Sequence, residues 1–381
     1  MRNSFAIAMA VLVTTALIGG VAGTAAGAQP TISTDGPAAD AQPATGAGPA
    51  VGTAGAAGAG PAQTDGACGF PLNVTDATGE TVTLEERPER ITTLNPSAAQ
   101  TLWELGVEER VVGVSRFASY LDGAEERANV SAEFGASVER VVDTEPDLVL
   151  APNSSAADVE PLREQGLTVY HFPAATGIDD IAEKTETIGR LVGACDAAAE
   201  TNAEMYDAVD AAEERTAGVD RPAALYPLGG GYVAANDTFI HSIMTASGTE
   251  NVAADYEAYP QLSDEVILES NPELIIVTDP EAPILDQEPY ASTTAGAEDG
   301  YVVMNVNYLN QPAPRSVIES TTTLSNAVVE LQAEGEEATD DAENETNEDE
   351  SAGDTGAEAP GFGVVAAALA LLATGLLARR D

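Results

Sequence analysis

The chain has 381 residues, 63 Asp or Glu against 15 Lys or Arg, and a formal net charge of −48 at pH 7. No basic patch is available to neutralise phosphates, so this balance argues against a nucleic-acid-binding protein. Self-repulsion of this size weakens a compact state at ordinary salt, whereas at molar salt the Debye length falls to about 3 Å, so the composition is typical of a halophile.

The N-terminal segment, residues 1–28, has the pattern of a secretory signal peptide. A charged start is followed by an apolar run and by small residues that end in Ala-Gly-Ala, which fits an A-x-A cleavage site. An uncleaved membrane anchor is the alternative. The first cysteine, Cys68, lies far from that site, which excludes a lipid-modified N-terminal cysteine. The mature protein is therefore expected outside the cell.

Two segments are expected to be disordered linkers by composition. Residues 29–66 are mostly Ala, Gly, Pro and Thr, with little to bury. Residues 333–359 hold twelve Asp or Glu and no Lys or Arg, so the segment should repel itself and stay extended. Both are expected to act as spacers.

The segment 360–381 begins with Pro360, Gly361 and Phe362, continues with apolar residues and ends near two arginines. It resembles the Pro-Gly-Phe C-terminal sorting signal of archaeal surface proteins. That resemblance implies an archaeosortase-like enzyme that cuts the tail and replaces it with a lipid anchor. A plain C-terminal transmembrane helix is the alternative. Either reading tethers the folded part to the outer face of the cell membrane.

The sequence also offers sites for covalent modification. Cys68 and Cys195 are its only cysteines, and an oxidising exterior permits a single disulfide between them. Five Asn-x-Ser/Thr sequons are compatible with a glycosylated surface protein, at Asn73, Asn129, Asn153, Asn236 and Asn344.

Residues 68–332 remain for the folded part, where short β-rich runs alternate with helical patterns. In the first half, strands are expected at 90–94, 111–115, 147–151 and 168–172. The first run precedes a helical pattern in which Ser97 is a candidate N-cap and Gly106 a stop. Strand, helix and strand at this spacing predict a parallel sheet, in an N-terminal α/β lobe over residues 68–178.

The second half repeats this scheme. Strands are expected at 223–228, 273–278 and 301–306, with helices at 238–246 and from Pro314 to Gln332. These elements predict a C-terminal α/β lobe over residues 218–332.

Between the lobes, residues 179–217 carry no proline and a helical stripe of apolar residues. One continuous connecting helix is expected, and two helices broken near Gly189 or Gly193 are the alternative. The predicted fold class is therefore α/β, with two lobes of mainly parallel sheet joined by one long helix and a ligand cleft between the lobes. A continuous rod would keep any hinge motion small.

Two distant segments have almost the same sequence pattern. "VERVVDTEPDLVLAP" at 138–152 aligns with "DEVILESNPELIIVT" at 264–278 at one offset, since 265 − 139 = 272 − 146 = 126. A repeat of this kind predicts two equivalent α/β surfaces on either side of one cleft, where open parallel sheets bind ligands.

The folded part resembles a known family through a series of stretches in family order. These include "RITTLNPSAAQTLWELG", "SVERVVDTEPDLVLAP", "TFIHSIMTASGTENVAAD" and "PQLSDEVILESNPELIIVT". They resemble the class III substrate-binding proteins of ABC importers, which take cobalamin, ferric siderophores or haem. The resemblance implies a receptor without catalysis or cofactor, whose ligand is cobalamin or a ferric siderophore, with haem as the alternative. It also implies an ABC permease dimer as partner.

In that family, one glutamate on each lobe docks against arginines of the two permease subunits. By position these are Glu139 and Glu265. A two-fold permease offers one basic site per subunit, so a pseudo-symmetric protein must present one carboxylate per lobe. Two solvated glutamates at helix starts are the alternative.

The loops after the expected strands supply the candidate ligand-binding residues. They are Asn95, Ser97, Arg116, Phe117, Tyr120, Asn153, Tyr232, Tyr308 and Arg315. Aromatic faces with a few polar groups suit a large, partly apolar corrinoid. Arg116 and Arg315 would instead suit the carboxylates or catecholates of an iron chelate. Ordinary loop packing is the alternative for each residue.

Other function classes find less support. Only His171 and His241 are present, and both are expected to have structural roles, so no direct metal site is predicted. The sequence has no Gly-x-Ser-x-Gly elbow of an esterase and no dinucleotide fingerprint after a strand. A structural surface protein without a transporter remains an alternative, although repeated β-sandwiches would be expected of it.

Overall fold

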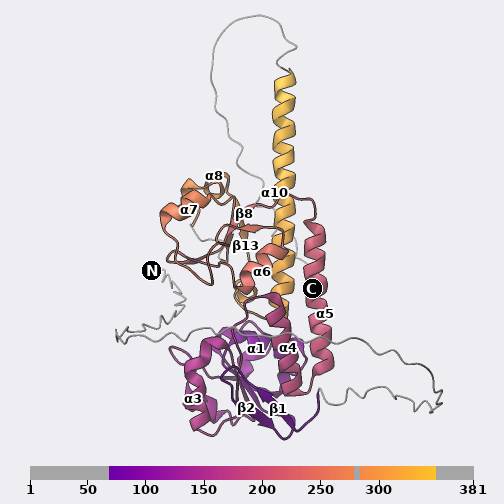
Figure 1. The fold of residues 1–381 in the computed structure, drawn as a ribbon, viewed down its shortest axis with the longest axis vertical. Coiled ribbons are helices and arrows are strands. Elements are labelled where there is room, and N and C mark those ends of the chain that lie inside the picture. Colours follow the sequence, from indigo (N-terminus) through magenta and orange to yellow (C-terminus); the bar gives the residue numbers. More distant parts are fainter. Residues whose placement is uncertain (1–67, 279–283, 349–381) are drawn as a thin grey trace, which may run out of the picture. The chain divides into compact units, whose positions relative to one another are not determined.

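The computed structural model describes residues 68–278 and 284–348, with side chains up to Ala333 in the last helix. Figure 1 shows two lobes along this part of the chain, the first in indigo and magenta and the second in orange. The signal peptide, the first linker and the C-terminal signal predicted above lie outside the described residues. Within residues 68–278 and 284–348, no helix is both long and apolar enough to cross a membrane.

The N-terminal lobe is built on a parallel sheet of five strands, in the order β5-β4-β3-β6-β7. Its strands are β3 (Ile91–Thr93), β4 (Val111–Val114), β5 (Ala128–Asn129), β6 (Leu148–Ala151) and β7 (Val169–His171). Each predicted strand of this half is present, slightly shorter than expected, and β5 is an addition.

The C-terminal lobe contains a second parallel sheet, in the order β11-β8-β12-β13. Its strands are β8 (Ala223–Leu225), β11 (Glu250–Asn251), β12 (Leu274–Val277) and β13 (Tyr301–Val303). After β8, the strands β9 (Pro227–Gly229) and β10 (Tyr232–Val233) pair as an antiparallel hairpin. The expectation of two α/β lobes with mainly parallel sheets is confirmed.

The central strands are uninterrupted apolar runs because both faces of each sheet are covered. Leu148 and Leu150 of β6 enter one hydrophobic cluster, whereas Val149 enters the cluster on the other face. Ile276 and Ile275 of β12 divide in the same way between two clusters of the second lobe. Such burial on both faces is typical of parallel sheets in α/β proteins.

Helices and short 3₁₀ segments connect the strands. In the first lobe they are α1 (Pro96–Glu104), η1 (Glu108–Arg110), η2 (Arg116–Ala118), η3 (Ala124–Glu126), α2 (Val138–Asp143), η4 (Asn153–Ser155) and α3 (Ala156–Glu164). In the second they are α6 (Phe239–Ala246), α7 (Asp264–Ser270), η5 (Tyr290–Ser292), α8 (Thr294–Glu298) and α9 (Val306–Leu309). The N-cap of α1 is Asn95, whose side chain accepts from Ala98 N, and not Ser97 as expected. Pro96 occupies the first helical position, which favours a cap immediately before it.

An antiparallel hairpin of β1 (Leu72–Thr75) and β2 (Thr81–Leu84) precedes the first sheet and was not expected from the sequence. Its inner residues, such as Leu72 and Val82, join the hydrophobic cluster of the N-terminal lobe. Just before it, Cys68 forms a disulfide with Cys195, with an S–S distance of 2.07 Å. The disulfide ties the beginning of this lobe to the helix that leaves it.

The expected single connecting helix is wrong, because the segment forms two helices. They are α4 (Ile178–Val192) and α5 (Cys195–Arg215), and Gly193 between them is left-handed with φ 68°. A Cβ on Gly189 would lie 2.6 Å from the Cβ of Ala198, so glycine permits α4 and α5 to pack closely. A glycine C-cap with this conformation is a common helix stop. The lobes are therefore connected by a helical hairpin rather than by a rod.

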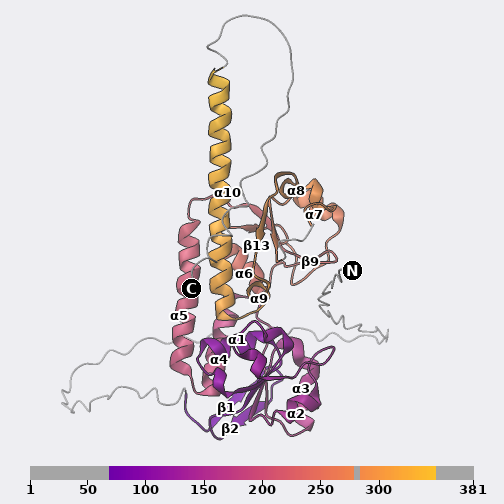
Figure 2. The same ribbon diagram turned by 180° about the vertical axis from the view of Figure 1, so that it is seen from behind.

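The last helix, α10 (Pro314–Glu348), packs along α5 and runs well past Gln332 (Figures 1 and 2). Residues 333–348 were expected to belong to a disordered linker, and this part of the prediction is wrong. A helix that is already nucleated by packing can be extended by residues of high helix propensity, such as the Ala and Glu found here. Residues 349–359 lie outside the described part.

Candidate functional site

The repeated sequence pattern forms the same local structure in both lobes. The helices α2 and α7, and the strands β6 and β12, begin at one offset, since 264 − 138 = 274 − 148 = 126. The hydroxyls of Ser137 and Ser263 cap the two helices, and each accepts a backbone N–H at 3.4 Å. Glu139 and Glu265 therefore occupy the same position, two residues after the capping serine.

Each of these helices stops in the same way. Glu145 and Asn271, again 126 apart, take left-handed conformations with φ 46° and 41°. A proline follows each of them and prevents the helix from continuing. The acid after the proline then binds the neighbouring strand segment: Asp147 accepts from the backbone N–H groups of residues 89 and 90, and Glu273 accepts from that of residue 223.

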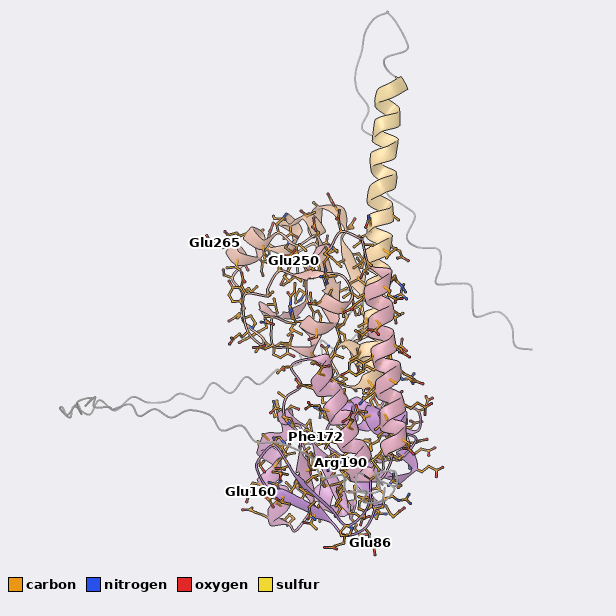
Figure 3. All side chains as sticks on the ribbon, turned by 45° about the vertical axis from the view of Figure 1, so that its right-hand side comes forward. Glu86, Glu160, Phe172, Arg190, Glu250 and Glu265 are labelled. Carbon is orange, nitrogen blue, oxygen red and sulfur yellow. A yellow bond between two sulfur atoms is a disulfide. The ribbon has the colours of Figure 1, made fainter. Side chains whose placement is uncertain are left out.

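Both candidate docking glutamates are exposed. Glu139 and Glu265 lie in the first turns of α2 and α7, where the helix dipole favours a negative charge. Figure 2 shows α2 and α7 on the same side of their lobes, away from α5 and α10, and Figure 3 shows Glu265 at the outer surface of its lobe. Both glutamates are therefore exposed on helices that lie on the same side of their lobes.

The loops after the strands of the two sheets meet between the lobes. Tyr120, after β4, packs edge-on against Tyr308, after β13, with ring centroids 6.1 Å apart. The Tyr120 hydroxyl donates to Gln100 Oε1 at 2.6 Å, and Gln100 Nε2 donates to Ser316 Oγ at 3.1 Å. Burial, followed by the nearby Tyr308 and Glu104, raises the pKa of Tyr120 above its ordinary range. The carboxyl edges of the two sheets therefore face each other here.

A buried hydrogen-bonded chain crosses the same region. Lys184 of α4, the only lysine of the protein, donates from Nζ to Ser97 Oγ at 2.7 Å and to the Pro312 carbonyl at 3.0 Å. Ser97 Oγ in turn donates to Asn95 Oδ1 at 3.0 Å. Burial lowers the pKa of Lys184 to about 7. Ser97 is fully buried, so the expectation that it lines the ligand cleft is not met, whereas Asn95 remains half-buried.

The rim of the N-terminal lobe combines an arginine with exposed aromatic rings. Arg116 donates from Nη1 to the Ala132 carbonyl at 2.7 Å and from Nη2 to the Glu133 carbonyl at 3.2 Å. Its guanidinium lies 4.7 Å from the ring centre of Phe117, which is 51% exposed. Phe134, absent from the sequence candidates, is 71% exposed in the adjoining loop. The sequence signal that could have identified Phe134 is its position as a single large aromatic residue in the polar loop between Ser131 and Gly135.

The C-terminal lobe also carries exposed aromatic side chains. Tyr232 of β10 is 40% exposed, and it follows three glycines, Gly229 to Gly231, that all have positive φ. Gln261 Nε2 donates to the Gly230 carbonyl at 2.7 Å and holds this turn. Tyr256 is a second exposed aromatic residue of this lobe that sequence reasoning missed.

The remaining candidates differ in their availability. Asn153 is exposed at the start of η4, directly after β6 and Pro152. Arg315 donates from Nε and Nη2 to the two carboxylate oxygens of Glu104, at 2.6 and 2.7 Å. This ion pair joins α10 to α1, so the Arg315 guanidinium is bound to Glu104 of the same chain.

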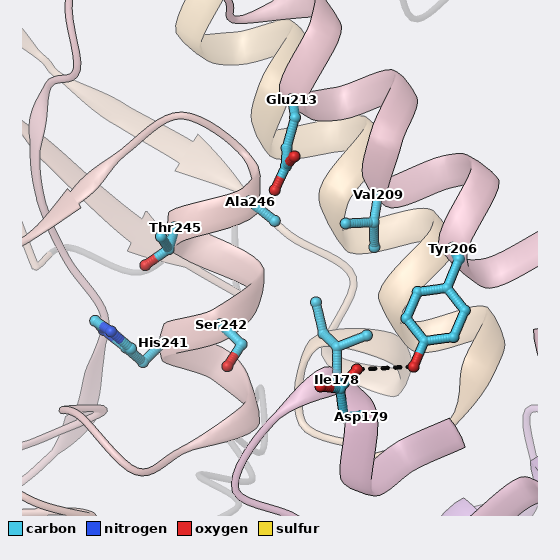
Figure 4. Close-up of a pocket in the computed structure, with 9 residues that line it drawn as sticks. All are labelled: Ile178, Asp179, Tyr206, Val209, Glu213, His241, Ser242, Thr245 and Ala246. Atoms are coloured by element: carbon cyan, nitrogen blue, oxygen red, sulfur yellow. Dashed lines mark hydrogen bonds between the residues drawn. The ribbon is translucent and has the colours of Figure 1, made fainter. Parts of the chain in front are cut away.

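Two open pockets lie away from the predicted ligand-binding residues. The first, in Figure 4, is formed by the start of α4 with α5 and α6, and Tyr206 donates to Asp179 Oδ1 at 2.8 Å at its edge. The second adjoins it at residues 176–180 and Ser242. None of the predicted ligand-binding residues lines either pocket. Across the described part of the chain, metal-ligating side chains do not gather in groups of three or more.

The two histidines have structural partners. His171 is buried in β7, and its Nδ1 lies 3.2 Å from the Ala151 carbonyl. His241 Nδ1 lies 3.2 Å from Asn251 Nδ2, and burial lowers the pKa of His241.

The chain is similar to several proteins along most of its folded part. The cobalamin-binding protein of Halobacterium salinarum is 43% identical over 341 residues, which cover 84% of this chain and 91% of that protein. A solved ABC-type Fe³⁺-hydroxamate transport system of Saccharomonospora viridis is 27% identical, with a TM-score of 0.57, covering 68% of this chain and 99% of that one. The periplasmic vitamin B12-binding protein of Vibrio cholerae has a TM-score of 0.56 at 22% identity, covering 64% and 98%.

Two family patterns cover different parts of the chain. The PGF-CTERM motif matches residues 359–380 and indicates a surface-anchored extracellular protein. The periplasmic binding protein family matches residues 91–304, which include both sheets and both repeated segments. The chain belongs to the periplasmic binding protein family.

Proposed function

We propose that this protein captures cobalamin between its lobes and delivers it to an ABC importer. The observation that carries this proposal is the 43% identity, across 84% of the chain, to a protein named as cobalamin-binding. The exposed aromatic side chains on both lobes support it, because the flat faces of Phe117, Phe134 and Tyr232 suit the large, partly apolar surface of a corrinoid.

The contacts that Arg116 and Arg315 already make within the protein favour a corrinoid over an anionic iron chelate. An iron chelate with carboxylates or catecholates would need free guanidinium groups at the rim. Arg116 donates to two backbone carbonyls, and Arg315 is paired with both oxygens of Glu104. Cobalamin carries amide side chains, which neutral partners such as Asn95, Asn153 and the tyrosine hydroxyls can bind.

The ligand is tested by titration of the purified protein in molar salt. Cobalamin, a ferric hydroxamate and haem are added separately, and binding is followed by calorimetry and by the fluorescence of Trp103, the only tryptophan. We expect saturable one-to-one binding of cobalamin without turnover, and much weaker binding of the other two. Saturable binding of the ferric chelate or haem alone would contradict the proposal.

Delivery is proposed to depend on Glu139 and Glu265. Each lies exposed at the same position of an equivalent helix, and the two helices face the same side. A permease dimer with one basic site per subunit would accept one carboxylate from each lobe. Charge reversal at these positions, described in the Discussion, separates delivery from ligand binding.

We also propose that an archaeosortase-like enzyme cuts the C-terminal tail near Pro360, Gly361 and Phe362 and that a lipid anchor then holds the protein at the membrane. The match of the PGF-CTERM motif to residues 359–380 supports this processing. Intact-mass measurement of the membrane-derived protein should show loss of the tail with an added lipid. A full-length, unmodified C-terminus would contradict it.

A further inference from the structure

The N-x-S/T sequons of this chain differ sharply once they are placed in the fold. Side chains are described at four of them, Asn73, Asn129, Asn153 and Asn236, and all four asparagines are exposed. The fifth, Asn344, lies in the part of α10 whose side chains are not described. The difference is in the hydroxyl residue two positions later, which the modifying enzyme must also recognise.

At three sequons that hydroxyl residue is buried. Ser131 accepts the backbone N–H of Arg116 at 2.9 Å, and Ser155, the last residue of η4, is buried. Thr238 donates to the Ala235 carbonyl at 2.7 Å and accepts the His241 N–H at 3.1 Å as the cap of α6. In the folded protein, these three sequons cannot present both of their recognised side chains.

Asn73 and Thr75 are both exposed on one face of β1. Their strand alternates buried and exposed residues, and residues two apart in a strand point to the same face. Thr83 of β2 donates its hydroxyl to Asn73 Oδ1 at 2.7 Å. This contact fixes the carbonyl side of the amide toward β2 and leaves the Nδ2 side available.

The side chains on the outer face of the β1–β2 hairpin are also uncharged. The outer face of the hairpin consists of two cross-strand pairs, Asn73 with Thr83 and Thr75 with Thr81, and all four side chains are exposed. A neutral face of this kind is unusual in a protein with a net charge of −48. Its hydroxyls and amide can hydrogen-bond a sugar without the desolvation of a carboxylate.

The hairpin lies clear of the surfaces assigned above. Figures 1 and 2 both show β1 and β2 at the end of the N-terminal lobe that faces away from the C-terminal lobe. In contrast, Asn129 and Asn153 sit at the carboxyl ends of β5 and β6, at the edge where the ligand is proposed to bind. A bulky sugar there would compete with the ligand, whereas one at Asn73 would not.

We propose that Asn73 is the acceptor of an N-linked oligosaccharide. The donor is a lipid-linked glycosyl phosphate or diphosphate, used by a membrane glycosyltransferase. Nδ2 of Asn73 forms a bond to the anomeric carbon of the sugar, and the bond from that carbon to the phosphate oxygen breaks. The phosphate leaves on the lipid with the bonding electron pair, and Nδ2 loses one proton. The glycan then covers the neutral outer face of the hairpin.

The test uses the full chain, with its own signal and C-terminal segment, expressed in a halophilic archaeon that has an N-glycosylation pathway. The protein is isolated from membranes, digested with a glutamate-specific protease and measured by mass spectrometry. We expect a glycan mass on the peptide that contains Asn73. The peptides that contain Asn129 and Asn153 should be unmodified.

Matched variants make the assignment specific. Asn73→Gln and Thr75→Val should each remove the glycan, whereas Thr75→Ser, which preserves the sequon, should retain it. Cobalamin binding should be unchanged within twofold in all three, because the hairpin is remote from the ligand edge. An unmodified Asn73 peptide, or a glycan on Asn129 or Asn153, would overturn the proposal. These outcomes are independent of which ligand the protein binds.

Discussion

The two lobes share a strand order but differ in the loops that follow the strands. The order β4-β3-β6-β7 of the first corresponds to β11-β8-β12-β13 of the second, and two pairs of strands begin at one offset, since 223 − 91 = 301 − 169 = 132. After β4, Arg116 braces the rim of the first lobe through two backbone carbonyls. After β8, the second lobe has a glycine-rich hairpin, whereas after β3, the corresponding strand, the first lobe continues directly into α1. The two lobes thus share their buried strands and their proposed docking glutamates. They differ in the loops where the ligand is proposed to bind.

The lobes also differ in how they are held. The two cysteines of the chain form one disulfide, which joins the start of the N-terminal lobe to α5. The C-terminal lobe is held by the packing of α6 and α10 around its sheet. Four predictions test how far the equivalence of the lobes extends, in order of decreasing effect.

The largest effect is expected from reversing the proposed docking charges. Glu139→Arg with Glu265→Arg should abolish cobalamin uptake by cells and leave cobalamin affinity unchanged. Each reversal would replace the proposed charge-assisted contact by repulsion, on the order of 2–5 kcal/mol. If the lobes are equivalent, the two single variants should impair uptake equally.

The matched control reverses two other exposed glutamates, Glu160 of α3 and Glu250 of β11, which Figure 3 labels with Glu265. This double variant has the same net charge and should transport normally. Normal uptake by the Glu139→Arg, Glu265→Arg protein, or equal loss in the control, would remove the docking assignment.

Removal of the disulfide should destabilise the N-terminal lobe more than the C-terminal lobe. Replacement of both Cys68 and Cys195 by serine opens a covalent loop with a sequence separation of 127. The chain-entropy model predicts a loss of roughly 5 kcal/mol. Hydrogen exchange should show faster exchange in the first sheet and little change in the second. An equal loss of protection in both lobes would show that they unfold as one unit.

Lys184 should make the stability of the region between the lobes depend on pH. Its pKa is lowered by burial from 10.5 to about 7, so between these values the unfolded chain binds a proton that the native protein does not. Stability conferred by this site therefore rises with pH from about 7 to about 10.5. The difference in unfolding free energy between wild type and Lys184→Met should change over this window by on the order of a few kcal/mol. A pH-independent difference would contradict it.

The smallest effects compare the equivalent acids Asp147 and Glu273. Asp147 accepts two backbone N–H groups and Glu273 accepts one. Asp147→Asn should therefore lower the free energy of unfolding by about 1–2 kcal/mol and Glu273→Gln by about 0.5–1 kcal/mol. Urea denaturation in molar salt measures both. A larger effect for Glu273→Gln would show that the number of hydrogen bonds does not determine how much these two acids contribute to the free energy of unfolding.

Much of the fold could be predicted because it follows from local rules. The strands β6 and β12 read as unbroken apolar runs, since both faces of each sheet are buried. The equivalent position of Glu139 and Glu265 followed from the repeat itself. The Gly193 break, in contrast, depends on α5 packing back against α4, and the helical state of 333–348 depends on a helix already held by α5.

The candidate site was predicted less completely than the fold. Loops after strands were correctly placed at the facing edges, as the contact of Tyr120 with Tyr308 shows. The partners of individual side chains were not predictable, because they come from distant parts of the chain. Arg315 pairs with Glu104 from 211 residues away, and Lys184 reaches Ser97 from 87 residues away.

By itself the sequence determined the secretion pattern, the acidic surface, the two parallel-sheet halves and the repeated helix with its glutamate. These features depend on composition, periodicity and capping, which act over a few residues. Only the tertiary structure decided which polar side chains remain free and which are bound to backbone groups or to the other lobe. It also decided which of the four sequons with described side chains exposes both of its members. Those outcomes depend on burial, and burial is set by contacts between residues far apart in the chain.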